Sequence, residues 1–148
     1  MDGIFNIGVH ALVYLSHKAC GLSSEALAGN ICTNAARVRM VMAKLKKAEL
    51  VETKEGSSGG YRFVKDAGLV SLDQVAEALE VRFVDAVWHS GGADMECLVA
   101  SGMAEIMDRI YRELDLQCRE RLRAITIGDI EKEIFGGGKA GTEAERRN

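Results

Sequence analysis

The stretch KEGSSGGYRFVKD, residues 54–66, decides the fold. It sets a small glycine and serine loop between two runs of alternating polar and apolar residues, 50–55 and 61–65, which is typical of two antiparallel strands joined by a turn. A phosphate-binding loop would need the pattern GxxxxGK[ST] followed at once by a helix. Here Gly60 is followed by Tyr61 and a strand pattern. The stretch therefore predicts a β-hairpin.

The residues before the hairpin predict three helices. Apolar residues recur at helical spacing over residues 4–19, and Ser23 is a good N-cap for a short helix that ends near Asn30. Thr33 or Asn34 can cap a third helix. Its buried face would hold Val38, Val41, Met42 and Leu45, and its opposite face Arg37, Met40, Lys44 and Lys47, with Arg39 and Lys46 at the flanks. Three helices and a hairpin in this order predict a winged helix-turn-helix.

The second half of the chain predicts a long helix. Ser71 caps a helix that supports the winged unit, and residues 91–99 interrupt the helical pattern as a loop. From about 101 to 124 an apolar stripe recurs at helical spacing: Met103, Ile106, Met107, Ile110, Leu114, Cys118, Leu122 and Ile125. Such a helix would be about 36 Å long, more than the small unit can cover. We expect it to pack against a second copy, and residues 126–134 to form a short closing helix.

These patterns give a fold class and a division of the chain. The fold is mainly α with a small β-hairpin wing, a winged helix-turn-helix plus a long C-terminal dimerisation helix. Residues 1–80 would be the DNA-binding domain, 81–100 a linker and sensing loop, 101–135 the dimerisation and closing helices, and 136–148 a disordered tail.

Composition narrows the class of protein. Hydrophobic residues make up 47% and charged residues 28%, which suits a globular protein, and no apolar run is long enough to span a membrane. We expect a cytoplasmic protein with no membrane partner. The net charge of -3 conceals an asymmetry: residues 1–65 carry nine Lys and Arg against five Asp and Glu, a balance of +4. This basic half favours a nucleic-acid partner.

Several motifs, in order, resemble one known family. They are HALVYLSH at 10–17, SSEALAGNICTNAARVRMVMAKLKKAELV at 23–51, GSSGGYRFVKD at 56–66, SLDQVAEAL at 71–79 and ITIGDI at 125–130. Together they resemble the small bacterial winged-helix regulators that include IscR, NsrR and CymR. The resemblance implies a homodimeric transcription factor, usually a repressor. Such a factor binds double-stranded DNA at a partly palindromic operator, with the third helix in the major groove and the wing at the minor groove.

On that resemblance, the DNA-binding residues fall on the third helix and the wing. Arg37, Arg39 and Met40 occupy its first turns, where an arginine can bond guanine. Phosphate contacts are expected from Thr33, Asn34, Lys44, Lys46 and Lys47. In the wing, Ser57, Ser58 and Gly59 are small enough to approach a narrow groove, Tyr61 packs under the loop, and Arg62 reaches phosphate. Relatives that insert an arginine into the minor groove tend to carry it just before the first wing glycine, where this chain has Glu55. The negative potential of the minor groove would repel this carboxylate, so reading bases deep in that groove is disfavoured.

Cys97 is the candidate sensing residue. Relatives that hold an iron-sulphur cluster use three loop cysteines, whereas this loop has only Cys97. We therefore expect no cofactor and no three-cysteine cluster, and keep an unusual ligand set from His89, Cys97, Cys118 and the first helix as an alternative. A thiol near a helix N-terminus has a lowered pKa and is present partly as thiolate, so Cys97 could act as a redox switch. The alternative is that Cys97 is an inert, partly buried thiol. Cys20 and Cys32 are expected to be core filler.

Two function classes follow. The leading one is a dimeric DNA-binding repressor, altered by oxidation of Cys97 or by a ligand near the loop. The alternative is a winged-helix module that mediates protein contacts without specific DNA binding, which Glu55 and the acidic second half favour. An enzyme is not expected, because no Ser-His-Asp set, paired carboxylates or nucleotide loop occurs at readable spacing.

Overall fold

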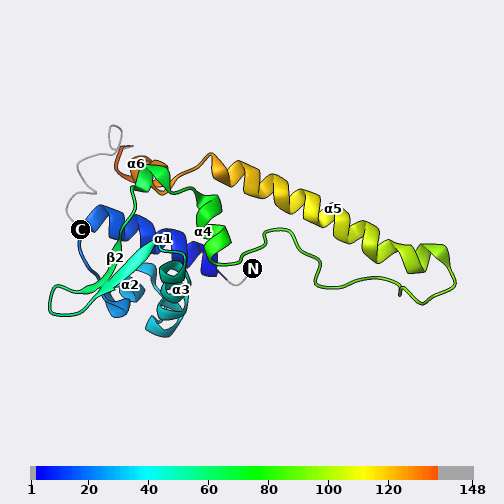
Figure 1. Ribbon diagram of the computed structural model, residues 1–148, viewed down its shortest axis with the longest axis horizontal. Helices are drawn as coiled ribbons and strands as arrows, with labels where there is room; N and C mark the ends of the chain where they lie inside the picture. The colour runs from blue at the N-terminus through cyan, green and yellow to red at the C-terminus, as the bar shows by residue number, and fades with distance from the viewer. Residues whose placement is uncertain (1–2, 137–148) are drawn as a thin grey trace, which may run out of the picture.

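Three helices and a two-stranded hairpin form the first half of the chain (Figure 1). The computed structural model describes residues 3–136. Its elements are α1 (Ile4–Lys18), α2 (Ser24–Ile31), α3 (Ala35–Lys47), β1 (Val51–Lys54), β2 (Gly60–Phe63), the 3₁₀ helix η1 (Ala67–Leu69), α4 (Leu72–Ala78), α5 (Leu98–Arg123) and α6 (Ile127–Gly136). This order confirms the predicted fold class.

The hydrophobic core lies among α1, α2, α3 and α4. Its largest fully buried side chains include Leu12 of α1, Leu27 of α2, Met42 and Leu45 of α3, and Leu79 just after α4. Each of these helices buries one stripe of apolar residues spaced three or four apart, so the four stripes share one interior. Most of the core is therefore built by the winged unit, and the fully buried Ile127 of α6 joins it.

The hairpin is held against the helices by backbone hydrogen bonds. β1 and β2 are antiparallel, with Val51 opposite Phe63 and Lys54 opposite Gly60. Leu22, before α2, pairs with Tyr61 through two backbone bonds of 3.0 and 2.8 Å. Gly60 has φ of +112°, and a Cβ there would lie 2.5 Å from the Leu22 carbonyl oxygen. The wing glycine thus serves close backbone approach and a conformation that L side chains rarely adopt.

A β-bridge and helix caps connect the second half of the chain to the winged unit. Ser71 and Gln74 form a capping box at the start of α4. Ser71 also bridges to Thr126, and Thr126 and Asp129 cap α6 reciprocally at 2.9 and 3.0 Å. Ile127 is fully buried beneath this turn. The chain therefore returns to the winged unit after α5, and α6 lies beside α1 (Figure 1).

Some predicted boundaries are wrong. α5 begins at Leu98, three residues before the predicted start, and Gly136 belongs to α6 rather than to the predicted tail. The rest of that tail, 137–148, lies outside the described residues. Cys20 and Cys32 are exposed, so the prediction that they fill the core is wrong. Within residues 3–136, none of the helices combines the length and the apolar character needed to cross a membrane.

Candidate nucleic-acid interface and sensing segment

A tight turn sets α3 across α2. Cys32 ends α2 in the left-handed region, with φ of 60°. Two residues later, the Asn34 side chain accepts a 2.9 Å hydrogen bond from the backbone N–H of Arg37 and starts α3. The sequence left Thr33 and Asn34 as alternative caps, and the structure gives this role to Asn34. Helix, turn and helix together have the arrangement of a helix-turn-helix.

The outward face of α3 differs from the predicted one. Val38, Val41, Met42 and Leu45 are buried as predicted. Diametrically opposite lie four exposed residues, which we call the outer ridge: Ala36, Met40, Ala43 and Lys47. Arg37 and Lys44 are half-buried at one flank of the helix, so the prediction that they share the outward face with Met40 is wrong.

The cations at the flanks of α3 contact neighbouring elements. Arg39 Nη1 lies 3.2 Å from Ser24 Oγ and 3.4 Å from a Glu25 carboxylate oxygen, both on α2. On the same flank, Lys46 Nζ donates to Thr53 Oγ1 of β1 at 2.9 Å. This last bond joins α3 directly to the wing.

On the opposite flank the cations face α1 and α4. Lys44 Nζ lies 3.0 Å from a Glu80 carboxylate oxygen, beyond the end of α4. The Arg37 guanidinium lies beside Gly3, just before α1. Positive charge therefore runs along both sides of the outer ridge, with less of it on the ridge itself.

The wing extends beyond α3 as a polar tip. Ser57 and Ser58 are exposed, Gly59 is half-buried, and the Gly59 N–H donates to the Gly56 carbonyl at 3.0 Å to close the loop. Tyr61 packs against the core under this loop. Arg62 lies opposite Glu52 in the hairpin, and its Nε is buried without a hydrogen-bond partner. The tip is therefore free of bulky side chains, and Arg62 is half-buried in the hairpin.

The segment 81–97 runs back along α5 to its far end (Figure 1). Asp115, the one buried residue of α5, accepts hydrogen bonds from the backbone N–H groups of Phe83 at 2.7 Å and Val84 at 3.0 Å. Further along, His89 Nε2 lies 2.7 Å from Asp108 Oδ1, and Gly92 N–H donates to the Ala100 carbonyl at 3.0 Å. The predicted sensing loop is thus an extended segment fastened to the helix at three points.

Cys97 is the N-cap residue of α5 and is exposed. The backbone N–H groups of Ala100 and Val99 hold the pKa of its thiol below the ordinary value of 9.0, because they stabilise the thiolate. This is the environment that the sequence predicted for the thiol. The Cys97 thiol is therefore exposed and has a pKa lowered by the backbone N–H groups at the start of α5.

The residues around Cys97 do not fit a three-cysteine cluster. Gly91 and Met103 stand six residues to either side, and neither offers a thiolate. Cys118 lies about six turns further along α5, too far to share a cluster with Cys97 on the same helix. Within residues 3–136, no group of three or more His, Cys, Asp or Glu side chains is arranged to hold a metal ion. We derive no role for iron from these residues.

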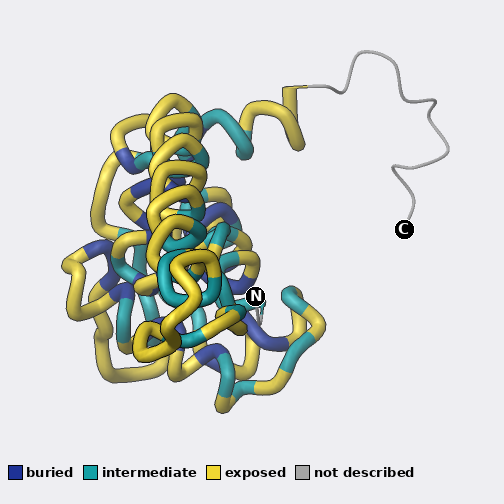
Figure 2. Tube along the Cα trace, turned by 90° about the vertical axis from the view of Figure 1, so that its right-hand side faces the viewer, coloured by how far each residue is buried: buried dark blue, intermediate teal, exposed yellow. Residues whose placement is uncertain are grey.

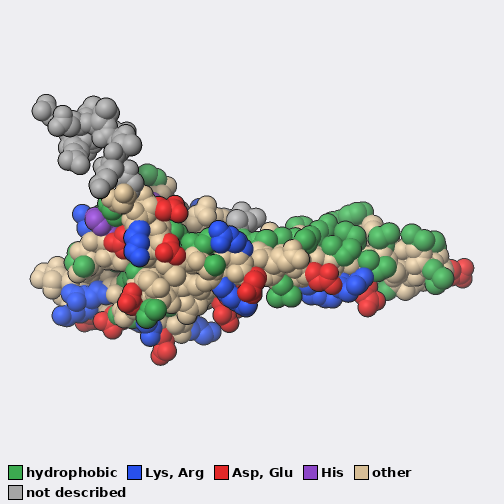
Figure 3. Space-filling model, turned by 90° about the horizontal axis from the view of Figure 1, so that it is seen from above, with side chains coloured by type: hydrophobic (Ala, Val, Ile, Leu, Met, Phe, Trp, Pro, Cys, Tyr) green, Lys and Arg blue, Asp and Glu red, His purple; other side chains and the backbone are tan. Residues whose placement is uncertain are grey.

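The apolar stripe of α5 packs against the core at Leu122, near the end of the helix, and is exposed further out in the single chain. Ile106, Ile110 and Leu114 are 48%, 37% and 42% exposed, and Val99 and Met103 continue the stripe towards the far end. α5 projects from the winged unit as an arm, and Figure 3 shows hydrophobic side chains gathered along one side of it. Figure 2, along the arm, shows α5 as exposed and half-buried residues. The arm is therefore an open apolar surface.

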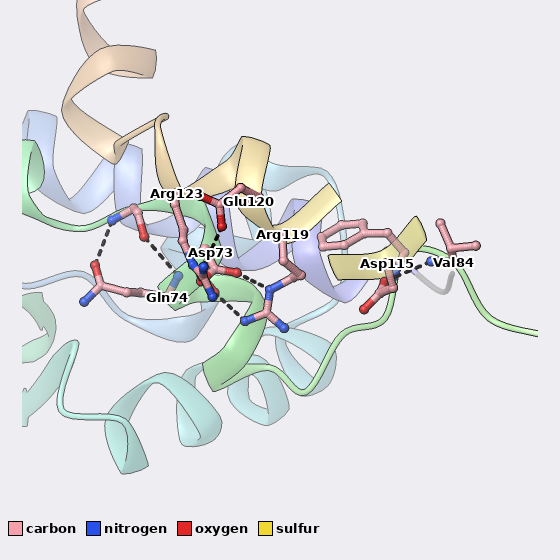
Figure 4. A network of polar contacts seen from close by, with 9 residues as sticks. Asp73, Gln74, Val84, Asp115, Arg119, Glu120 and Arg123 are labelled. Atoms are coloured by element: carbon pink, nitrogen blue, oxygen red, sulfur yellow. Dashed lines mark hydrogen bonds and ion pairs between the residues drawn. The ribbon is translucent and has the colours of Figure 1, made fainter. Parts of the chain in front are cut away.

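A buried ion-pair network joins α5 to α4 (Figure 4). The Asp73 carboxylate, 8% exposed, accepts hydrogen bonds from Arg119 Nε and from Arg123 Nε, the latter at 3.1 Å. Burial alone would raise the pKa of Asp73, but the two guanidinium groups outweigh it and hold that pKa below 3.8. The sequence gave no local signal for this pairing, because Asp73 lies 46 and 50 positions away from the two arginines.

A groove between α1 and α6 was also not predicted. It measures about 660 Å³ and is lined mainly by apolar residues of α1 and by Ile130, Ile134 and Phe135 of α6. His17 stacks on Phe135 with ring centroids 3.9 Å apart. The groove forms only when α6 returns beside α1, so no single stretch of sequence predicts it.

A helix-turn-helix followed by a hairpin wing, with cations along the second helix, defines the class of winged-helix DNA-binding proteins. A family model described as Rrf2, iron-dependent transcriptional regulator, matches residues 2–133 of this chain. The chain therefore belongs to the Rrf2 family of transcriptional regulators.

Individual relatives agree with this assignment. The chain is 29% identical over 96 residues to the HTH-type transcriptional regulator IscR of Vibrio campbellii, a match covering 65% of this chain and 54% of that protein. The match thus spans about half the length of this curated relative. A solved structure from Lactobacillus plantarum has a TM-score of 0.78 at 20% identity, covering 93% of both chains. CymR of B. subtilis has a TM-score of 0.63 at 18% identity, covering 90% of this chain and 96% of its own. At these identities the structures establish the fold.

Proposed function

We propose that this chain is a homodimeric, DNA-binding transcriptional repressor that acts in the cytoplasm on a partly palindromic operator. The observation that carries the proposal is the 2.9 Å bond between Lys46 and Thr53, which makes α3 and the wing one continuous surface. A helix for the major groove and a wing for the adjoining groove are then presented together. Family membership supports DNA as the partner.

The DNA-binding surface comprises the third helix, its cap and the wing. Its proposed members are Thr33, Asn34, Arg37, Arg39, Met40, Lys44, Lys46, Lys47, Ser57, Ser58, Gly59, Tyr61 and Arg62. Among them Lys44 and Arg62 contribute least, because Lys44 faces Glu80 and Arg62 is half-buried. Arg39, Lys46 and Lys47 lie nearer the exposed side of the helix, where phosphates would approach.

The test of DNA binding is fluorescence anisotropy of the full chain with genomic fragments, including the DNA upstream of its own gene, across a salt series. We expect specific binding whose affinity falls steeply with salt. Lys46→Ala should weaken binding to every sequence and reduce the salt slope by about one. Glu77→Ala, on α4, is the matched control and should change neither. Absence of specific binding to any fragment would favour the protein-interaction module, for which Glu55 and the acidic second half argue.

The apolar stripe of α5 supports the dimer. α5 has 26 residues and so is about 39 Å long, yet it buries only Asp115 in the single chain. Pairing two stripes about a two-fold axis would cover them and present two α3 helices to two half-sites, which is why we propose a palindromic operator.

Charge on the stripe tests this dimer. The double substitution Ile106→Glu and Ile110→Glu should produce a monomer in sedimentation equilibrium, because the carboxylates would lose water on pairing. Specific DNA affinity should fall at least tenfold with it. Arg109→Glu adds a carboxylate to an exposed position off the stripe and should leave a dimer. A double variant that stays dimeric would place the dimer interface elsewhere.

Cys97 is the proposed sensing residue, either through oxidation of its thiolate or through a ligand bound near the segment 81–97. Its exposure and its lowered pKa support oxidation. Mild peroxide would oxidise the thiolate to a sulfenic acid, with peroxide reduced to water. We expect peroxide to weaken operator binding, and Cys97→Ser to abolish that response. Cys20→Ser is the control, since Cys20 is exposed but does not precede a helix. Binding that is indifferent to peroxide would leave the repressor and remove the oxidation switch.

A further inference from the structure

The outer ridge of α3 is small and largely apolar, although a DNA-facing helix usually presents hydrogen-bonding groups. Ala36, Met40, Ala43 and Lys47 succeed one another at intervals of four, three and four residues, so they fall within about 60° of arc on the helix. All four are exposed, and Met40 is 49% exposed. Only Lys47, at the last turn, ends in a hydrogen-bonding group.

The groups that could bond base edges lie on the flanks, and the contacts described above hold three of them there. Arg39 contacts Ser24 and Glu25, and Lys46 contacts Thr53. Lys44 contacts Glu80 on the other side. A helix lying in the major groove with its ridge towards the bases would turn these flanks towards the two phosphate walls. The sequence favoured guanine contacts from Arg37 and Arg39. Arg39 would then have to leave α2, and Arg37 lies on the other flank, beside Gly3.

Base edges differ in what they offer to an apolar ridge. In the major groove guanine, cytosine and adenine present hydrogen-bonding groups, which alanine and methionine side chains cannot satisfy. Thymine also presents a hydrogen-bond acceptor, O4, but it is the one base with a C5-methyl group, which takes an apolar contact. The two alanines also let the backbone of α3 approach closely, and the flexible Met40 thioether can adapt its shape to a methyl group.

From these observations we infer that α3 reads its half-site chiefly through thymine C5-methyl groups, contacted by Ala36, Met40 and Ala43, while the flanking cations bind phosphate. The inference rests on the proposed function and adds the chemical class of base that the operator must carry. It requires thymines, on either strand, at the centre of each half-site.

The test replaces thymine with deoxyuridine, which removes the C5-methyl group and leaves base pairing unchanged. Operators are first selected from random-sequence DNA with the full chain. Each thymine of a half-site is then replaced singly, and the Kd is measured by anisotropy. We expect about a fourfold loss of affinity at one or more thymines, the effect of no longer taking one methyl group out of water.

Two variants assign the effect to the ridge. Met40→Ala shortens an exposed side chain, so the fold should be unaffected. In this variant, replacing at least one of the half-site thymines with deoxyuridine should no longer change the Kd. Lys46→Ala should weaken binding to the thymine and deoxyuridine duplexes by the same factor, because its role is with phosphate.

The outcomes separate the two proposals. Selected operators whose affinity is unchanged by deoxyuridine at every half-site position would overturn the inference and leave the repressor intact. The inference would also be overturned if deoxyuridine changed the Kd by the same factor in the wild type as in three variants: Met40→Ala, Ala36→Gly and Ala43→Gly. Failure to select any sequence would remove the proposed function, and this inference with it.

Discussion

The winged unit and the α5 arm are both helical, yet they bury their residues in opposite ways. In the winged unit α1 alone buries six residues within fifteen, including Leu12 with no exposed surface. α5 is almost twice as long and buries one, the polar Asp115. The same helical spacing of apolar residues therefore has two outcomes. A stripe that meets other stripes of its own chain becomes a core, and one that projects beyond them stays exposed in the single chain.

The largest expected effect comes from breaking the core of the winged unit. Leu12→Ala should lower the free energy of unfolding by about 2–5 kcal/mol, because a fully buried site leaves a cavity. Ile106→Ala removes a side chain that is 48% exposed on the arm and should leave the unfolding of the winged unit unchanged. Urea unfolding at one fixed protein concentration measures both. Equal losses would mean that arm and unit share one core.

A smaller effect is expected at the point where the two regions meet. Asp73→Asn keeps the shape of the side chain but removes the charge that binds Arg119 and Arg123. The loss should be about 1–3 kcal/mol at neutral pH, the range for hydrogen bonds to charged groups. Asp85→Asn, at an exposed pair with Arg82, is the control and should have little effect.

The pH dependence sharpens that prediction. The pKa of Asp73 is lowered in the folded chain, so its contribution is fully present above its ordinary pKa of about 3.8 and is lost as the pH falls below that value. The difference in unfolding free energy between wild type and Asp73→Asn should therefore be constant from pH 7 to pH 5 and shrink towards pH 3. A difference that grows on acidification would contradict the assignment of the charge.

The smallest effect separates two helix starts. Ser71 caps α4 with its side chain, and Ser71→Ala should cost about 1 kcal/mol in urea unfolding. Cys97 occupies the same position in α5 without a side-chain cap hydrogen bond. Cys97→Ala should accordingly leave the unfolding midpoint where it is. A measurable shift from Cys97→Ala would mean that this residue supports the arm structurally.

Local patterns predicted what depends on local contacts. The stripe of Val38, Val41 and Leu45 defines α3, and the glycines at 56–60 define the wing, because each follows from neighbouring residues. The lowered pKa of Cys97 also followed from its place before a helix.

Contacts between distant parts of the chain could not be predicted in this way. Arg119 reads as solvent-facing until α5 is placed beside α4, which brings it to Asp73. The prediction for the outward face of α3 was wrong because Lys44 turns towards Glu80, beyond α4, and Arg37 towards Gly3, before α1. The apolar spacing within α3 does not indicate where α1 and α4 lie. The start of α5 was missed by three residues because the glycines around it mask the helical pattern.

Cys97 and the two arginines that bind Asp73 lie at opposite ends of α5, so the helix has the form of a lever. About 39 Å of α5 separates the thiol from the far end of the network around Asp73. A displacement of about 3 Å at the Cys97 end corresponds to a rotation of only about 5° at the other. Under the proposed oxidation of Cys97, a change at that end of α5 would therefore reach the winged unit as a small rotation.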